Sequence, residues 1–279
     1  DSAFLNLRGA AKIYTIYDLA VFREETQLPF YTSERHKRII DQKTKAFLKK
    51  ADGVIAISKV TKNDILRFYD FPEDKIRIIP LAPNKIEEST KKEIDLKFHQ
   101  LEKNAYFLFV GQISIRKNII NLLKAFLLSG LHSDYKLVLA GMEGRGIEII
   151  KEAILELGLN ERVELLNYIP DESLSSLYEN SAGFVFPTYY EGFGIPILEA
   201  MMNRTPVLSG NIGASPETAG GFAVEVSPFS VDEISEGLKN LLAIPKDKIE
   251  SAFNYANKFN WQNNAIETHK FYEDTLNSL

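Results

Sequence analysis

Two carboxylates flank a turn that could bind a charged or hydroxylated ligand. Glu191 and Glu199 lie in the string EGFGIPILE. The apolar run at residues 183–187 suits a buried parallel strand, and Pro196 suits the first turn of the helix that follows, because no amide hydrogen is needed there. Free amides at a helix N-terminus can receive an anion, most often a phosphate. Acidic side chains repel phosphate, so we expect the glutamates to bind sugar hydroxyls, since a carboxylate accepts bidentate hydrogen bonds.

A second turn carries two adjacent cations. A strand is expected to end at Gly111, and Arg116 and Lys117 stand where the next helix, residues 117–128, should begin. Cations at a helix N-terminus oppose the helix dipole, so they need solvent or an anion. A diphosphate would supply the anion, with Arg116 binding phosphate bidentately and Lys117 acting as a point charge. An isolated Arg-Lys pair is usually solvated, but on the same sheet edge as the glutamate turn it predicts a phosphate site.

The string EGFGIPILEA around Glu191 and Glu199 resembles the signature of the retaining glycosyltransferases of family four, which depend on nucleotide sugars and have the GT-B fold. The alternative is a plain strand-loop-helix with a solvated acidic pair. We favour the resemblance because Arg116 and Lys117 also stand where the family carries Arg-Lys. The similarity covers nearly the whole chain and is densest from residue 105 to residue 221.

The resemblance implies a role for each matched residue. Arg116 and Lys117 would bind the diphosphate of the donor and stabilise it as it leaves. Glu191 would orient the transferred hexose, and Glu199 would hold the ribose of the nucleotide. The expected catalytic residues are Glu191, Arg116 and Lys117. The expected donor-binding residues are Gly111, Arg116, Lys117, Tyr168, Ile169, Glu191, Gly192, Phe193, Gly194, Ile195, Pro196 and Glu199. The family mechanism needs no metal and no cofactor, because the nucleotide sugar is itself the substrate.

The first predicted strand, residues 12–16, ends at a polar tip. Ligand-contacting residues gather at such tips in open α/β sheets. The family usually has His-Asp at this place; here Tyr17 replaces the histidine and receives no role, whereas Asp18 matches and is an expected contact from the N-terminal side. Glu217 also matches a recurring acid of the family, and we interpret it as structural, capping or pairing in a turn.

Composition limits the classes of function. The chain has 279 residues, 45% of them hydrophobic and 25% charged, as in ordinary globular proteins. Its formal net charge of -5 argues against a nucleic-acid partner. The absence of cysteine excludes thiol nucleophiles, disulfides and Cys-zinc sites, and the four histidines lack metal-ligand spacing. Neither a membrane-spanning run nor a signal peptide is evident, so a cytoplasmic location is expected.

Strand and helix patterns predict an α/β protein of the GT-B type. Regular βα alternation from residue 105 indicates a doubly wound parallel sheet, with every strand ending on one edge. The expected strands are residues 106–110, 136–140, 163–166, 183–186, 206–208 and 222–226. The expected helices are residues 117–128, 146–157, 173–180, 195–202 and 231–242. The predicted divisions are the C-terminal part of a Rossmann-like acceptor-side domain (1–81), a linker (82–104) weakly helical around 94–101, a nucleotide-sugar-binding Rossmann-like domain (105–245) and helices returning to the first domain (246–279).

A basic helix is expected over residues 33–50, capped by Ser33, with Ile39, Ile40, Ala46 and Phe47 on its inner side. A basic amphipathic helix can dock on an anionic membrane surface, where a lipid-linked acceptor would lie. The plainer interpretation, which we favour, is a solvated face. Peripheral contact with the inner face of the membrane stays an alternative.

The expected function is transfer of a hexose from a donor of the GDP-mannose or UDP-glucose type to a glycan or lipid-linked acceptor, with retention of configuration. One alternative is a donor-binding module without catalysis, or a half-enzyme that needs a missing N-terminal part. The chain opens at Asp1 without methionine, and in the family several strands precede this point, so we expect residues upstream and poor transfer by the chain alone. Another alternative is a nucleotide-sugar epimerase, which shares the architecture but is disfavoured by the pairing of the two turns.

Overall fold

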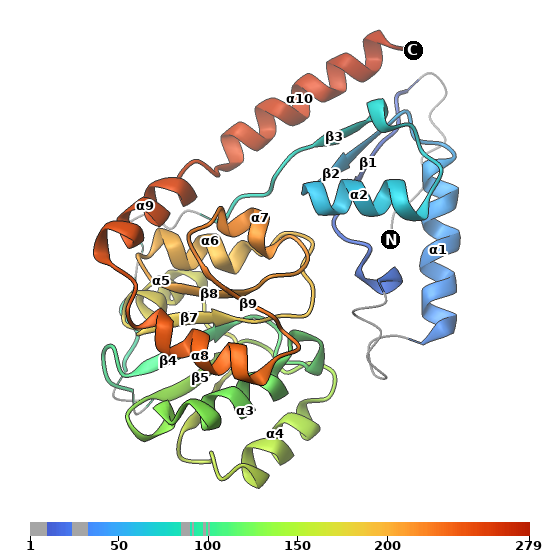
Figure 1. Ribbon diagram of the computed structural model, residues 1–279. Helices are drawn as coiled ribbons and strands as arrows, with labels where there is room; N and C mark the ends of the chain where they lie inside the picture. Colours follow the sequence, from blue (N-terminus) through green and yellow to red (C-terminus); the bar gives the residue numbers. More distant parts are fainter. Residues whose placement is uncertain (1–9, 24–32, 85–89, 91, 97–98, 100) are drawn as a thin grey trace.

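The computed structural model describes residues 10–23, 33–84, 90, 92–96, 99 and 101–279, which form two parallel β-sheets with helices on both faces (Figure 1). We call the three-stranded sheet and the helices packed on it the first unit: β1–β3 with α1, α2 and α10. The six-stranded sheet and its helices form the second unit: β4–β9 with α3–α9. The chain therefore returns to the first unit at its last helix.

The first unit is built on a short sheet in the order β1-β2-β3, with every pair parallel. Its strands are β1 (Ile13–Ile16), β2 (Gly53–Ala56) and β3 (Ile76–Ile78), and its helices are α1 (Glu34–Leu48), α2 (Lys59–Phe68) and α10 (Trp261–Asn277). Alternation along β2 sets the two faces. Val54 packs with Leu48 of α1 and Ile65 of α2, whereas Ile55 packs with Phe271 of α10.

The second unit is built on a parallel sheet in the order β6-β5-β4-β7-β8-β9. Its strands are β4 (Tyr106–Val110), β5 (Lys136–Ala140), β6 (Val163–Leu166), β7 (Gly183–Phe186), β8 (Val207–Gly210) and β9 (Val224–Val226). β4 and β7 are fully or nearly fully buried, because helices cover both faces of the sheet. Aromatic rings fill its centre: Phe109 and Phe184 each stack on Phe186, with centroids 5.7 and 5.4 Å apart.

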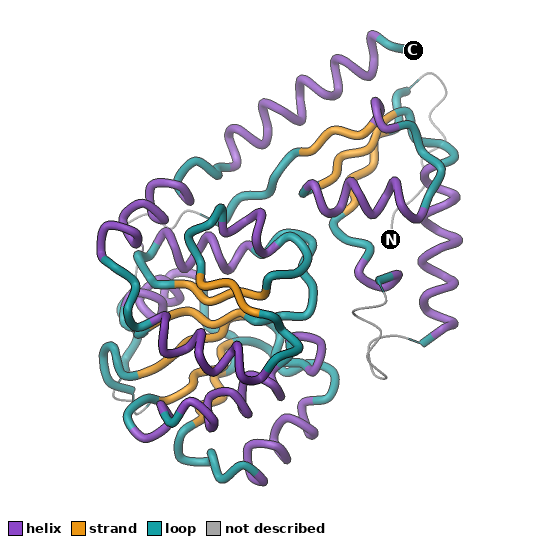
Figure 2. Tube along the Cα trace, in the orientation of Figure 1, coloured by secondary structure: helices purple, strands orange, loops and turns teal. Residues whose placement is uncertain are grey.

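The helices of the second unit lie above and below this sheet (Figure 2). They are α3 (Ile119–Ser129), α4 (Ile147–Glu156), α5 (Asp171–Glu179), α6 (Ile195–Met202), α7 (Ser215–Ala219), α8 (Val231–Leu241) and α9 (Lys246–Ala256). α3 packs against α8, and α6 packs against α7 and α9. Four short 3₁₀ turns complete the described elements: η1 (Ala20–Phe22), η3 (Glu73–Lys75), η5 (Ile115–Lys117) and η6 (Leu131–Ser133).

The predicted α/β class and the parallel sheet are confirmed, with differences in detail. The helix predicted over residues 117–128 begins only at Ile119, after a separate 3₁₀ turn. The segment after β8, interpreted as a turn, contains the short helix α7. On α1 the inner side is set by Ile40, Phe47 and Leu48; Ile39 is 40% exposed, and Ala46 is also exposed. Ile39 and Ala46 face outward because they lie off the stripe that Ile40, Phe47 and Leu48 form at positions i, i+7 and i+8 of the helix.

The predicted linker, residues 82–104, falls partly on residues 85–89, 91, 97, 98 and 100, which lie outside the described residues. Its described part runs along the second unit: Lys92 donates to Glu172 of α5 through its backbone amide at 2.8 Å, and Leu101 is buried in the core. The weak helix expected around 94–101 is absent from the described residues of that range. The domain boundaries themselves stay a prediction.

Among the residues that the structure describes, no helix combines the length and the apolar content needed to cross a membrane.

Candidate functional site

Sheet order brings the two predicted turns together. β4 and β7 are neighbours, with Phe107 opposite Gly183 and Leu108 opposite Phe184. Because both strands run in the same direction, their following loops leave the sheet side by side at its carboxyl edge. The loop after β4 carries the cations, and the loop after β7 carries Glu191.

Lys117 and Glu191 form an ion pair across these loops. Lys117 Nζ lies 2.6 Å from Glu191 Oε1, and the two side chains are only 10% and 13% exposed. The ammonium also lies 5.4 Å from the ring centroid of Phe186, which places it over an aromatic face. Arg116 belongs to the same 3₁₀ turn, η5, and is half-buried. A cation and a carboxylate that sequence reasoning assigned to one site are therefore in direct contact.

Asn118 separates the cations from the helix. Its φ of 63° is left-handed, a conformation that asparagine tolerates better than most residues, and α3 starts after it. Its buried amide donates to Pro187 O at 2.8 Å and to Pro228 O at 2.6 Å. This side chain therefore ties the loop after β4 to the loop after β7. Sequence reasoning missed it, and the only available signal was an asparagine between a basic pair and an apolar helix.

The N-terminus of α6 is left without a side-chain cap within the described chain. Gly194 is its N-cap at φ 101° and ψ 50°, and Pro196 lies in the first turn. The Glu191 carbonyl accepts the amide of Ala214 at 3.0 Å. A Cβ on Gly213 would lie 2.9 Å from that carbonyl, so glycine is needed for this close approach. The loop is thus held by backbone contacts while the first amides of α6 face the carboxyl edge.

Glu199 lies in α6 and is mostly buried. It accepts a hydrogen bond from the hydroxyl of fully buried Tyr178 of α5 at 3.0 Å. Burial raises the pKa of Glu199, and the nearby Asp171 carboxylate raises it further, whereas the bond from Tyr178 lowers it. The same burial raises the pKa of Tyr178 well above its ordinary value, so this hydroxyl stays a donor. Tyr178 lies outside both motifs and was not predicted.

The remaining predicted donor residues are distributed around this edge. Gly111 follows β4 directly and has a φ of 142°, a backbone conformation that favours glycine. Tyr168 is 64% exposed after β6, and Ile169 is half-buried against the core. Phe193 is different: its side chain is buried against Phe259, so only its backbone could meet a ligand.

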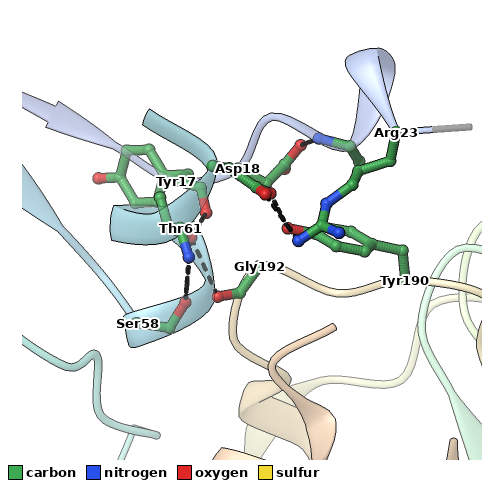
Figure 3. A network of polar contacts seen from close by, with 9 residues as sticks. Tyr17, Asp18, Arg23, Ser58, Thr61, Tyr190 and Gly192 are labelled. Atoms are coloured by element: carbon green, nitrogen blue, oxygen red, sulfur yellow. Dashed lines mark hydrogen bonds and ion pairs between the residues drawn. The ribbon is translucent and has the colours of Figure 1, made fainter. Parts of the chain in front are cut away.

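The first unit reaches the same loop through the tip of β1 (Figure 3). A Cβ on Gly192 would lie 2.2 Å from Tyr17 O and 2.8 Å from Asp18 Cβ, so the two backbones touch. Asp18 is exposed beside this contact, and its carboxylate accepts the amide of Ala20 at 3.1 Å. The Tyr17 side chain is 59% exposed. The structure therefore brings Asp18 to the Glu191 loop, and its role as a ligand contact stays a prediction.

Glu217 joins the two units rather than stabilising its own turn. Both of its carboxylate oxygens lie 3.0 Å from the backbone amide of Lys59, at the first position of α2. The Ser58 hydroxyl accepts the amide of Thr61, three residues later. A carboxylate at a helix N-terminus is favoured by the dipole, so Glu217 acts as a second cap for α2.

Within the described ranges, no group of three or more histidine or acidic side chains is arranged to hold a metal ion.

Comparison with known proteins shows the family to which the chain belongs. Residues 91–259 match the family described as "Glycosyl transferases group 1", and residues 2–82 match "Glycosyltransferase Family 4". The O-antigen chain mannosyltransferase B of Escherichia coli is 31% identical over 97% of this chain and 72% of its own length. The O-antigen chain mannosyltransferase RfbU of Salmonella typhimurium is 29% identical over 78% of this chain. The chain spans only 59% of the length of RfbU.

Solved structures agree on the fold. A sucrose-phosphate synthase from Thermosynechococcus elongatus superposes with a TM-score of 0.78 at 23% identity, covering 96% of this chain and 68% of that one. Anabaena HepE, solved in complex with UDP-glucose, gives 0.71 at 19% identity, covering 96% and 72%.

Two parallel-sheet units that superpose on these solved structures define a glycosyltransferase fold of the GT-B type. The chain belongs to the glycosyl transferases group 1 family.

Proposed function

We propose that the chain transfers a hexose from a nucleoside-diphosphate sugar, of the GDP-mannose or UDP-glucose type, to a glycan or a lipid-linked acceptor. The contact between Lys117 and Glu191 carries this proposal, because it sets a phosphate-binding cation beside a carboxylate suited to sugar hydroxyls. The relatives named as mannosyltransferases favour GDP-mannose, and the neighbour solved with UDP-glucose keeps that donor in consideration.

The donor would lie along the carboxyl edge. Arg116 and Lys117 would bind the diphosphate, together with the uncapped amides of α6. Glu191 would then orient the hexose, and Glu199 would hold the ribose. Since charge develops on the departing diphosphate, preorganised cations and amides would supply the main stabilisation without a metal ion.

Transfer would retain the anomeric configuration. A bond forms between the acceptor oxygen and the anomeric carbon on the face that the diphosphate leaves. The bond from that carbon to the phosphate oxygen breaks, and the departing phosphate takes the proton of the acceptor hydroxyl. No protein nucleophile is needed in this step. The anomeric configuration of the product, measured by NMR, tests it, and inversion would contradict it.

A panel of nucleotide sugars tests the donor. A ligand at about a hundred times its dissociation constant adds about 2.7 kcal/mol to stability, which a thermal shift detects. We expect one nucleotide family to shift the unfolding midpoint more than the others. A panel without any shift would contradict the proposal.

A second candidate, a donor-binding module without catalysis, is favoured by Tyr17. An exposed phenol replaces the imidazole that the resemblance implies at this tip of β1. Hydrolysis and transfer assays with a bound donor separate the candidates. Binding without either reaction would favour the module.

As the alternative to a solvated face, we further propose that α1 brings the protein to the inner, cytoplasmic face of a membrane. Residues 33–50, which contain α1, carry seven cationic side chains: Arg35, Lys37, Arg38, Lys43, Lys45, Lys49 and Lys50. Six are exposed, and Ile39 is exposed among them. Each cation near an anionic surface contributes about 1 kcal/mol. Sedimentation with anionic vesicles, compared with neutral ones, tests this; equal binding to both would indicate a merely solvated face.

A further inference from the structure

The loop that carries Glu191 also touches α2 of the first unit (Figure 3). The Tyr190 hydroxyl donates to Asp64 Oδ2 at 2.5 Å. The Thr61 hydroxyl lies 3.3 Å from Tyr17 O and 3.5 Å from Gly192 O. The residues on both sides of Glu191 are therefore in contact with the first unit.

Asp64 is a buried charge that depends on a partner from each unit. Its side chain is 1% exposed, and Arg23 Nη2 lies 2.6 Å from Oδ1 while Tyr190 occupies Oδ2. The Arg23 guanidinium also lies over the Tyr190 ring, 5.5 Å from its centroid. A buried carboxylate is tolerated only when it is paired and hydrogen-bonded. Arg23 thus neutralises the charge, and Tyr190, a residue of the second unit, donates the hydrogen bond to the second carboxylate oxygen.

The Tyr190 hydroxyl is a dependable donor to Asp64. Tyr190 is 3% exposed, and burial followed by the bond to the Asp64 carboxylate raises its pKa. The phenol therefore stays protonated over the range in which proteins fold and bind.

Tyr190 is joined to Glu191 by one planar peptide bond. The Glu191 carbonyl is fixed by Ala214, and its carboxylate meets Lys117. The loop is thus held on one side by the first unit and on the other by the second. A displacement of Tyr190 would therefore act on the backbone of Glu191, its neighbour in the chain.

We propose that Tyr190 is a positioning residue that, through its bond to Asp64, ties the Glu191 loop to the first unit and so orients the Glu191 carboxylate toward the hexose of a sugar nucleotide. This inference rests on the proposed function, in which Arg116 and Lys117 hold the diphosphate and Glu191 meets the sugar. Tyr190 acts on the hexose only through Glu191.

The test separates the hexose from the rest of the donor. Tyr190→Phe keeps the ring and removes the hydroxyl. Calorimetric titration of the 279-residue chain gives dissociation constants for GDP-mannose and GDP, and for UDP-glucose and UDP. The ratio of the diphosphate constant to the sugar-nucleotide constant measures the hexose contribution. We expect this ratio to fall by about threefold or more in the variant, with the diphosphate constant unchanged.

Tyr189→Phe is the matched control. It removes the same hydroxyl from the neighbouring residue, whose partner is Asn121 within the second unit, at 3.2 Å. We expect the hexose ratio of this variant to equal that of the wild type. Asp64→Asn is a second probe, because it keeps an oxygen for Tyr190 but removes the charge that Arg23 neutralises. It should lower the ratio in the same direction by a smaller factor, and it carries the test if Tyr190→Phe does not fold.

The outcomes are distinct. If the wild type binds a sugar nucleotide and both Tyr190→Phe and Asp64→Asn keep its hexose ratio, the role of Tyr190 is overturned and the proposed function stands. Equal weakening of diphosphate and sugar nucleotide would mean a general packing role and would also overturn it. If the wild type binds no sugar nucleotide, the proposed function is wrong, and the role of Tyr190 falls with it.

Discussion

Lys117 and Glu191 neutralise each other at the carboxyl edge, so a bound diphosphate must share or take over the cation. The carboxylate released from the pair would then be available to hydroxyl groups of the ligand. In the proposed function, this ion pair would therefore serve an anion and a sugar at once.

Replacing Lys117 with Ala tests this at a single residue. We expect binding of GDP or UDP to weaken by ~1.5–3 kcal/mol, more than tenfold, because one charged hydrogen bond is lost. Stability should also fall, since Glu191 is left nearly buried and unpaired, and adding Glu191→Gln should restore part of it. Calorimetry and denaturant unfolding measure the two effects.

Lys151→Ala is the control for that variant. Lys151 pairs with Glu143 at 2.9 Å, but both side chains are well exposed. Surface pairs contribute about 0–1 kcal/mol, so little change is expected. An unchanged nucleotide affinity in Lys117→Ala would place the binding site elsewhere.

The raised pKa of Glu199 should make the free energy of unfolding depend on pH. Burial raises its pKa in the folded state, so the folded chain holds this proton more tightly than the unfolded chain. The resulting stability is fully present below the ordinary glutamate pKa of about 4.3 and is lost as pH rises through the raised value. The free energy of unfolding of the wild type minus that of Glu199→Gln should therefore decrease with rising pH in this window.

Tyr178→Phe gives a second test of the pH dependence of the free energy of unfolding. Its hydroxyl lowers the pKa of Glu199, so removing it should move the pH window upward. A stability difference between wild type and Glu199→Gln that grows with pH would show that the carboxyl is instead stabilised as the anion.

Among elements, α2 depends on an acid from the other unit. Removing Glu217 with Glu217→Ala should cost about 1 kcal/mol, typical of a lost helix cap. Hydrogen exchange of the Lys59 amide and the first turn of α2 should accelerate. Glu233→Ala is the control, because Glu233 accepts the Ser227 amide within the second unit. Acceleration at α2 in both variants would contradict the capping role.

Elements were predicted well where local pattern decides them. The strands β4 and β7 are apolar runs that stop before Gly111 and Pro187, and their limits agree with prediction at both ends. The predicted start of α3 was wrong because Asn118 takes a left-handed conformation before the helix. Its side chain is held there by hydrogen bonds to the carbonyls of Pro187 and Pro228, which are distant in sequence. α7 was missed because a helix of this length next to glycines has little periodicity.

Some residues of the candidate site could be predicted from local motifs, and others could not. Lys117, Glu191 and Glu199 follow from spacing within two motifs, although their roles in binding stay a prediction. Tyr178 and Asp64 could not be predicted, since neither belongs to a motif and each acquires its partner only when distant elements pack.

At the scale of the whole molecule, α10 covers the outer face of the first sheet. Phe271 is buried against Ile55 and Ile79, and a Cβ on Gly53 would lie 2.8 Å from its ring. Arg77 lies over that ring and pairs with Asp274 at 2.8 Å.

Phe271→Ala should therefore destabilise the first unit by about 3–5 kcal/mol through the lost burial and the cavity. Tyr272→Ala, the neighbouring position, removes a ring that is 46% exposed and should have little effect. Denaturant unfolding with hydrogen exchange at β2 measures both. Equal stability of the two variants would mean that α10 does not brace the sheet.

The position of α10 also has a consequence for biosynthesis. On the ribosome, the strands of the first sheet emerge early, but one of their faces stays exposed to water until residues 261–277 have followed. A premature stop or a protease cut near residue 258 would thus uncover Ile55 and Ile79 in the first sheet. The first sheet is completed by a segment that is synthesised after the whole of the second unit.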